Sequence, residues 1–203
     1  ASDRAYHRPM SPASDQAGRD RTMLRLADSH GRVATDLRVS LTDRCNLRCS
    51  YCMPAEGLNW LPHDSTLTDD EVIQLITIAV ERLGVTEVRF TGGEPLLRSG
   101  LERIVAATAS LGVPTALTTN GIGLARRAEA LAAAGLHRVN ISLDTLSPQR
   151  FTEITRRPRL DDVLTALTAA SDAGLRPVRG NAVLLRGFRI PAEDRALAAA
   201  GRP

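Results

Sequence analysis

The feature that most restricts the fold of this chain is a regular alternation of short apolar strands with amphipathic helices. Strand patterns occupy residues 37–41, 85–90, 114–119, 138–143 and 177–185. Helical patterns lie between them, over residues 69–83, 99–111, 122–134 and 161–173, with a short helix opening at Ser147 and Pro148. Strands and helices that alternate at this spacing form parallel βαβ units, whose right-handed crossovers curl into a barrel or an open twisted sheet. The sequence therefore predicts an α/β fold with about five βα units.

Local signals set the boundaries of the first two helices. Thr68 and Glu71 have the spacing of a capping box, and Gly84 stands where a left-handed residue ends the helix at 69–83. Ser99 and Glu102 repeat the capping spacing, so we expect them to cap the second helix.

Polar motifs follow four of the predicted strands. They are the cysteines after residues 37–41, Gly92-Gly93-Glu94-Pro95, Thr118-Thr119-Asn120-Gly121, and Ser142 with Asp144. The carboxyl ends of parallel strands share one edge, where α/β barrels assemble their active sites on rigid strand ends and variable loops. We therefore expect these motifs to converge.

Cys45, Cys49 and Cys52 form a C-x3-C-x2-C run and are the only 3 cysteines of the chain. Four cysteines would complete a tetrahedral zinc site or ligate every iron of a 4Fe-4S cube, whereas three leave one iron open. An amino-acid-like cofactor such as S-adenosylmethionine would chelate that iron through its amino and carboxylate groups. Tyr51 would place an aromatic ring beside the cofactor. A zinc site with His63 as fourth ligand is the alternative.

Gly92 and Gly93 let a ligand approach the backbone without obstruction by side chains. Glu94 would accept hydrogen bonds from an ammonium group, and Pro95 fixes the turn. Together with the cysteines, this motif is interpreted as the floor of a cofactor pocket.

Composition limits the class of protein. With 203 residues, 43% of them apolar, the chain builds one core by default, and no apolar stretch approaches the ~20 residues of a membrane span. An odd number of closely spaced cysteines points to a reducing compartment, so we expect a cytoplasmic protein. A net charge of +3 suits an anionic partner, while 3% aromatic residues are too few for the stacking platforms of nucleic-acid binders.

The segments 37–54 (LRVSLTDRCNLRCSYCMP) and 89–98 (RFTGGEPLLR) resemble radical S-adenosylmethionine enzymes. Within these enzymes the chain is similar to the GTP 3′,8-cyclases of molybdenum cofactor biosynthesis. The resemblance runs from about residue 26 to 187 and includes Thr118-Thr119-Asn120-Gly121 and Asn140-Ile141-Ser142-Leu143-Asp144. It implies a partial (βα) TIM-like barrel of the radical SAM type, open on one side.

The resemblance also implies a chemistry. A reduced 4Fe-4S cluster on the three cysteines would split S-adenosylmethionine into methionine and a 5′-deoxyadenosyl radical. That radical would take hydrogen from the 3′ carbon of GTP, and the sugar would then attack carbon 8 of guanine. The implied cofactor-binding residues are Tyr51, Gly93, Glu94 and Ser142, and the implied GTP-binding residues are Arg38, Arg89, Thr118 and Arg179. No side chain is assigned as a catalytic acid or base.

The chain departs from this family in two places. Arg179 replaces a lysine that contacts GTP, and Gly180 follows where a β-branched residue is expected. The family's second 4Fe-4S cluster, which holds the guanine base, is not encoded here, so we expect a truncated chain with cluster binding, slow cofactor cleavage and little cyclisation. The expected organisation is a disordered arm at 1–25, the partial barrel at 26–187 and a divergent tail at 188–203.

By analogy with the family, the partners would be GTP, an electron donor of flavodoxin or ferredoxin type, and cyclic pyranopterin monophosphate synthase, with no membrane. Two alternatives remain at this point. One is a non-catalytic iron-sulfur or zinc binding module, and the other is a different radical S-adenosylmethionine enzyme.

Overall fold

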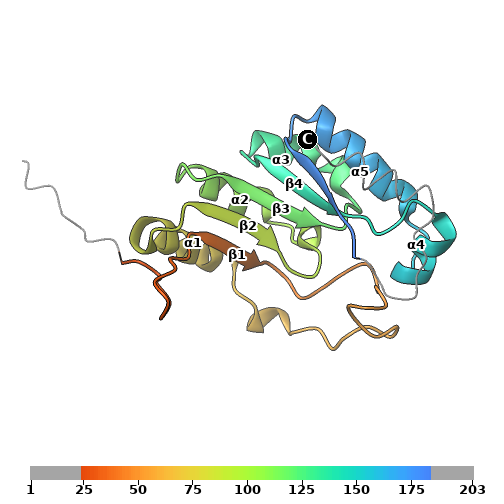
Figure 1. The fold of residues 1–203 in the computed structure, drawn as a ribbon, viewed down its shortest axis with the longest axis horizontal. Helices are drawn as coiled ribbons and strands as arrows, with labels where there is room; N and C mark the ends of the chain where they lie inside the picture. Colours follow the sequence, from red (N-terminus) through yellow and green to blue (C-terminus); the bar gives the residue numbers. More distant parts are fainter. Residues whose placement is uncertain (1–23, 184–203) are drawn as a thin grey trace, which may run out of the picture.

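The structure, a computed structural model, describes residues 24–183 of the chain. Its strands form one parallel sheet in the order β1-β2-β3-β4-β5, with bounds Asp36–Ser40, Glu87–Thr91, Thr115–Thr119, Arg138–Ser142 and Val178–Asn181. The α-helices are α1 (Asp69–Leu83), α2 (Leu101–Ala109), α3 (Ala128–Ala133), α4 (Pro148–Thr155) and α5 (Leu160–Asp172). Short 3-10 helices are η1 (His63–Ser65), η2 (Pro95–Leu97) and η3 (Leu124–Arg126). The predicted α/β fold is confirmed, and Figure 1 shows the arrangement.

The sheet is open within the described residues, since β1 pairs only with β2 and β5 only with β4. This agrees with a partial barrel. A hollow of about 690 Å³ runs along β1 and α1, and it is lined partly by apolar side chains such as Leu37, Val39, Leu75 and Ile76.

The apolar core lies between the sheet and its helices. Val88, Phe90, Leu117, Val139 and Ile141 have no exposed surface, because alternate residues of the central strands face the helices. The helices contribute these apolar side chains to the same core: Val72, Ile76, Ala79, Leu101, Ile104, Val105, Leu131, Val163, Ala166 and Ala170. Burying this one face leaves the other face of the sheet available for polar side chains.

Helix α1 has the bounds that its sequence predicts. The side chain of Thr68 accepts from the Glu71 amide at 3.3 Å, and Glu71 Oε2 accepts from the Thr68 amide at 2.8 Å, which completes the capping box. Gly84 ends the helix in the left-handed region at φ 75°.

The predicted start of the second helix is wrong. Gly100, not Ser99, is the N-cap of α2, and a Cβ at this position would collide with the Asp69 carboxylate. Glu102 is unavailable for capping because it pairs with Arg127, whose Nε lies 2.6 Å from Oε1.

The helix predicted over 122–134 is divided into η3 and α3. Gly121 and Gly123 both adopt positive φ, at 85° and 95°, and the tight turn that they form delays the start of the helix. The strand predicted at 85–90 begins two residues later, at Glu87.

The predicted arm at 1–25 lies outside the described residues except for Leu24 and Arg25, and the predicted tail at 188–203 lies outside them completely. Residues 184–187 of the predicted barrel also lie outside. No helix within residues 24–183 is long and apolar enough to cross a membrane.

Candidate functional site

The sheet carries polar side chains on the face opposite its helices. Because alternation and register are known for every strand, the members of this polar face can be named. They are Asp36, Arg38, Ser40, Glu87, Arg89, Thr91, Ala116, Thr118, Arg138, Asn140, Ser142, Arg179 and Asn181. The five predicted binding residues that stand on strands, Arg38, Arg89, Thr118, Ser142 and Arg179, all belong to it. The fold thus brings them to one surface.

The three cysteines lie in the loop that follows β1, here called the cysteine loop (residues 41–53). Arg48 stiffens this loop, since its Nη1 donates to the Cys45 carbonyl at 2.6 Å and its guanidinium stacks 5.3 Å from the Trp60 ring centroid. The Cys52 amide donates to the Cys49 carbonyl at 2.9 Å, which forms a turn. Side chains outside the cysteines therefore shape the loop.

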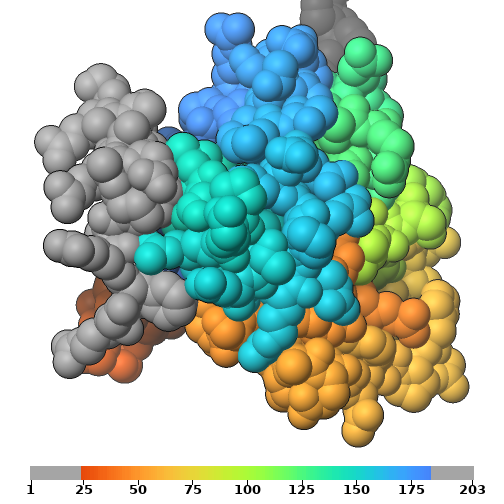
Figure 2. Space-filling model, turned by 90° about the vertical axis from the view of Figure 1, so that its right-hand side faces the viewer, coloured from red at the N-terminus to blue at the C-terminus, as the bar shows by residue number. Residues whose placement is uncertain are grey.

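The far end of the cysteine loop is docked on the end of α4. The amides of Arg48 and Ser50 donate to the carbonyls of Thr155 and Ile154, at 3.0 and 2.8 Å. Arg156, in the left-handed region at φ 57°, donates from Nη1 to the Arg48 carbonyl at 2.8 Å. In Figure 2 the orange loop lies below the teal and blue surface of α4 and α5. Sequence reasoning missed Arg156, because its partner is 108 residues away.

The near end of the cysteine loop is joined to the glycine motif by main-chain hydrogen bonds. The Gly93 amide donates to the Thr42 carbonyl at 2.7 Å, and the Glu94 amide donates to the Arg44 carbonyl at 2.8 Å. A Cβ at Gly93 would lie 2.5 Å from the Asp43 carbonyl oxygen and closer still to that of Arg44. Glycine is required here for a contact within the protein as well as for the expected approach of a ligand.

Glu94 is fully buried and ties β2 to β3. Its Oε1 accepts from the Thr119 hydroxyl at 2.7 Å and from the Leu96 amide at 3.0 Å, and its Oε2 accepts from the Asn120 amide at 2.7 Å. Burial raises its pKa, while the hydrogen bonds from Asn120, Leu96 and Thr119 oppose this rise. Both carboxylate oxygens of Glu94 therefore already accept hydrogen bonds from the protein itself. The predicted contact of Glu94 with the cofactor stays a prediction.

Tyr51 joins the cysteine loop to the end of β4. Its hydroxyl donates to Asp144 Oδ2 at 2.8 Å, and the other oxygen of Asp144 accepts from the Val183 amide at 2.8 Å. Burial and the hydrogen bond to Asp144 both raise the pKa of Tyr51, so its hydroxyl stays protonated as a donor. The sequence pointed to the position of Tyr51, but the contact with Asp144 comes from the structure.

Asn120 is a further link that sequence reasoning did not assign. Its Nδ2 donates to Asn46 Oδ1 at 2.7 Å and lies 3.8 Å from Cys45 Sγ, while its Oδ1 accepts from the Ile122 amide at 2.9 Å. The end of β3 therefore reaches the first cysteine directly.

The thiols of Cys45 and Cys49 have an environment that disfavours free thiolates and suits a positively charged metal centre. Burial, together with the charges of Asp144 and Cys45, raises the pKa of Cys49 to about 11. Burial also raises the pKa of Cys45, and the nearby Glu94 charge adds to this. Bound iron would add positive charge beside these thiolates, in addition to the charge of Arg48 near Cys45. The donor set thus fits a cluster by its chemistry.

The site is not gathered into a metal-binding geometry as it stands. Among residues 24–183, no group of three or more histidine, cysteine, aspartate and glutamate side chains is close enough to hold a metal ion. Cys52 is exposed, whereas Cys45 and Cys49 are half-buried and none of the three forms a disulfide. His63 belongs to no such group among these residues either, so its role as a zinc ligand stays a prediction, like that of the three cysteines as cluster ligands.

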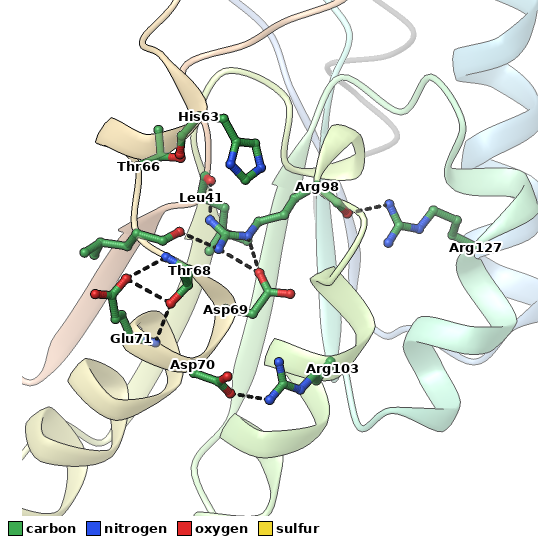
Figure 3. A network of polar contacts seen from close by, with 11 residues as sticks. Leu41, His63, Thr66, Thr68, Asp69, Asp70, Glu71, Arg98, Arg103 and Arg127 are labelled. Carbon is green, nitrogen blue, oxygen red and sulfur yellow. Dashed lines mark hydrogen bonds and ion pairs between the residues drawn. The ribbon is translucent and has the colours of Figure 1, made fainter.

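Arg98 fastens three segments that meet beside the cysteine loop (Figure 3). Its Nη1 donates to the Leu41 carbonyl at 2.8 Å, its Nη2 to the Leu67 carbonyl at 2.8 Å, and its Nε to Asp69 Oδ1 at 2.7 Å. Only 13% of this side chain is exposed. Arg98 thereby fixes the start of the cysteine loop against α1 and the glycine motif.

Replacing Arg98 by methionine should lower the free energy of unfolding by about 2 to 3 kcal/mol, because it leaves two carbonyls and a carboxylate without their donor. Urea unfolding of the metal-free chain measures this loss. Arg103→Met is the matched control, since the Arg103–Asp70 pair is exposed and should contribute less than about 1 kcal/mol. Equal stability of the two variants would contradict the assigned role of Arg98.

Comparison with known families gives a match over most of the chain. The model of the radical SAM superfamily matches residues 39–191. The GTP 3′,8-cyclase of Mycobacterium sp. (strain KMS) is 65% identical over 161 residues, which are 78% of this chain and 46% of that protein. The GTP 3′,8-cyclase of Streptomyces coelicolor is 64% identical over 165 residues, covering 80% of this chain and 48% of that protein. The chain thus spans about half the length of the curated relatives that it matches.

Solved structures share the fold at low sequence identity. Streptococcus suis SuiB bound to S-adenosylmethionine aligns with a TM-score of 0.65 and 23% identity, over 84% of this chain and 37% of that one. Methylornithine synthase (PylB) aligns with a TM-score of 0.63 and 16% identity, over 82% of this chain and 49% of that one. These likenesses support the architecture of the sheet and helices.

Proposed function

The chain belongs to the radical SAM superfamily, and on that basis we propose that it acts in the cyclisation of GTP between the 3′ carbon of the ribose and carbon 8 of guanine. Membership implies a 4Fe-4S cluster and S-adenosylmethionine. The assignment of GTP as substrate is supported by relatives named GTP 3′,8-cyclase, at 65% and 64% identity.

The observation that carries this proposal is the direct bonding of the cysteine loop to the glycine motif at one end of the polar face. The amides of Gly93 and Glu94 donate hydrogen bonds to the carbonyls of Thr42 and Arg44. These two acceptors lie three residues and one residue before Cys45. A ligand at the cysteines would therefore meet the exposed backbone of Gly93, and the hydrogen bond of Tyr51 to Asp144 joins the same loop to the chain just after Ser142. This placement supports a cofactor between the three cysteines and the polar face.

Within this arrangement, Cys45, Cys49 and Cys52 would hold one 4Fe-4S cluster. When bound, the cluster and S-adenosylmethionine supply the radical that starts the reaction. The chain's own part is to position them. Tyr51 would limit water access from the loop side, since its ring is fixed by the hydrogen bond to Asp144.

The substrate would lie farther along the polar face. Arg38, Arg89 and Arg179 present guanidinium groups that suit a triphosphate, because their planar forks form paired charge-assisted hydrogen bonds. Thr118, half-buried beside Asn140 on β3 and β4, would contact the sugar or base.

We propose further that the protein works in the cytoplasm, where its free thiols stay reduced. An electron donor of flavodoxin or ferredoxin type would reduce the cluster. Cyclic pyranopterin monophosphate synthase would take the product, by analogy with the pathway of the relatives.

GTP carrying deuterium at the 3′ carbon tests the substrate. After anaerobic reconstitution and reduction, the chain should release 5′-deoxyadenosine that contains deuterium, because the sugar hydrogen is the one transferred. Mass spectrometry of the nucleoside measures this, and the same incubation with 3′-deuterated ATP is the control. Unlabelled 5′-deoxyadenosine with GTP would contradict GTP as substrate while leaving cofactor cleavage intact.

A further inference from the structure

Arg38, Arg89 and Arg138 form an arginine level across the polar face, set back from the carboxyl ends of the strands. Arg38 is in register with Arg89, Arg89 with Ala116, and Ala116 with Arg138. At a strand spacing of about 4.8 Å, Arg89 lies about 5 Å from Arg38 and about 10 Å from Arg138 across the small side chain of Ala116. The main-chain positions of the three arginines thus lie within about 15 Å of one another, so that their long side chains can converge on one polyphosphate group.

Glu87 holds two of these guanidinium groups. Its Oε1 accepts from Nη2 of Arg89 at 3.2 Å and from Nη2 of Arg138, and Asp36 Oδ2 also accepts from Arg89 Nη2, at 2.8 Å. Desolvation alone would raise the pKa of Glu87, but the Arg89 and Arg138 partners outweigh it and lower the pKa. Glu87 is therefore ionised at neutral pH.

The two guanidinium groups keep unused hydrogen-bonding capacity. Among the described residues, their bonds run from Nη2 alone, and the buried Nε atoms of Arg89 and Arg138 have no partner. The buried Oδ1 of Asn140, on the same face, also lacks one. A guanidinium has five N–H donors, so the Nη1 donors of each group, rather than the buried Nε, are left for an anion while Nη2 stays on Glu87.

Charge at this level favours an anion. Three arginines face two carboxylates, those of Asp36 and Glu87, so one positive charge is uncompensated before Arg179 is counted. The side chains of Glu87, Arg89 and Arg138 are 26%, 25% and 20% exposed, which leaves them accessible from the polar face.

We infer that Arg138 binds the polyphosphate of the nucleotide together with Arg38 and Arg89, and that Glu87 is the positioning residue that holds Arg89 and Arg138 side by side. This inference rests on the proposed function. Arg138 begins β4 and Ser142 ends it, so at about 3.3 Å per residue the arginine level lies about 13 Å from the proposed cofactor edge. That separation accommodates a nucleotide whose sugar lies near the cofactor and whose phosphates extend to the arginine level.

A rival explanation is that Arg138 only neutralises Glu87. The two explanations differ in a double variant. If Arg138 is merely a counter-ion, Glu87→Gln with Arg138→Met removes both charges and restores anion binding. If Arg138 itself binds phosphate, the double variant stays weak.

Calorimetric titration of the reconstituted chain with GTP and with inorganic tripolyphosphate decides between them. Arg138→Met should weaken both affinities by about tenfold or more, as expected for a lost charge-assisted contact. The affinities of Arg138→Lys should lie between those of Arg138→Met and those of the parent chain. Glu87→Gln/Arg138→Met should remain at least about fivefold weaker than the parent. Arg103→Met, which removes an arginine from the exposed pair with Asp70, should change neither affinity by more than about twofold.

Circular dichroism and thermal unfolding identify any variant that fails to fold, and Arg138→Lys then carries the test alone. Parental affinity in Arg138→Met, or full recovery in the double variant, would overturn the role of Arg138 and leave the proposed function standing. If the parent binds neither GTP nor tripolyphosphate, the substrate assignment fails, and this inference fails with it.

Discussion

Replacing Cys49 by serine should reduce bound iron from about four atoms per chain to less than one, because a 4Fe-4S cube does not survive on two thiolates. Loss of a residue that only supports a metal ligand already lowers metal affinity or activity by about 10- to 100-fold. Loss of a ligand itself should therefore lower the rate of S-adenosylmethionine cleavage by more than about 100-fold. The chain has 3 cysteines in total, so none is left to take the place of Cys49. Iron analysis and quantification of 5′-deoxyadenosine measure the two effects.

Ser50→Ala is the matched control for this variant. Ser50 is the next residue of the same loop, its side chain is exposed, and its amide, which docks on Ile154, is unchanged by the substitution. We expect parental iron content in this control. A Cys49→Ser protein that still carries about four irons would contradict a cluster held by three cysteines.

Replacing Gly93 by alanine should separate the glycine motif from the cysteine loop. The new Cβ would lie 2.5 Å from the Asp43 carbonyl oxygen and even closer to the Arg44 carbonyl, and main-chain atoms cannot turn aside as a side chain does. Overpacking of this kind costs about 1 to 3 kcal/mol. The hydrogen bonds that the Gly93 and Glu94 amides form would weaken as well, at roughly 1 kcal/mol each.

We therefore expect Gly93→Ala to lower the free energy of unfolding by about 2 to 4 kcal/mol and the affinity for S-adenosylmethionine by about tenfold or more. Urea unfolding and equilibrium binding measure these changes. Gly180→Ala is the control, since a Cβ at Gly180 meets nothing within 4 Å, and its stability should change by less than about 0.5 kcal/mol. Equal behaviour of the two alanine variants would show that the close contact at Gly93 does not organise the site.

The parts of the fold that short-range signals control could be predicted from the sequence. Helix α1 matched in both bounds because the Thr68 capping box and the Gly84 C-cap are local devices. Polar motifs at successive strand ends were also sufficient to predict that distant segments share one edge. The pairing of β1 with β2 and of β3 with β4 confirmed this convergence.

The errors arose where a distant residue decides the local structure. Ser99 had the spacing of a cap, but Asp69, 30 positions earlier, leaves room only for glycine at position 100. Glu102 cannot complete the capping box because its carboxylate accepts a hydrogen bond from Arg127. Glu87 and Arg138 are 51 residues apart, so no spacing rule links them. The same holds for the contacts of Arg156 and Asn120 with the cysteine loop. These links depend on how distant segments pack together, which no single segment encodes.

The central claim is that three cysteines hold a cluster with one iron free to bind S-adenosylmethionine. Electron paramagnetic resonance of the reconstituted, dithionite-reduced chain tests it most directly. We predict the signal of a reduced 4Fe-4S cluster, with g values that shift when S-adenosylmethionine is added and return when it is removed. A reduced cluster whose spectrum is the same with and without S-adenosylmethionine, or a chain that takes up no iron at all, would contradict the claim.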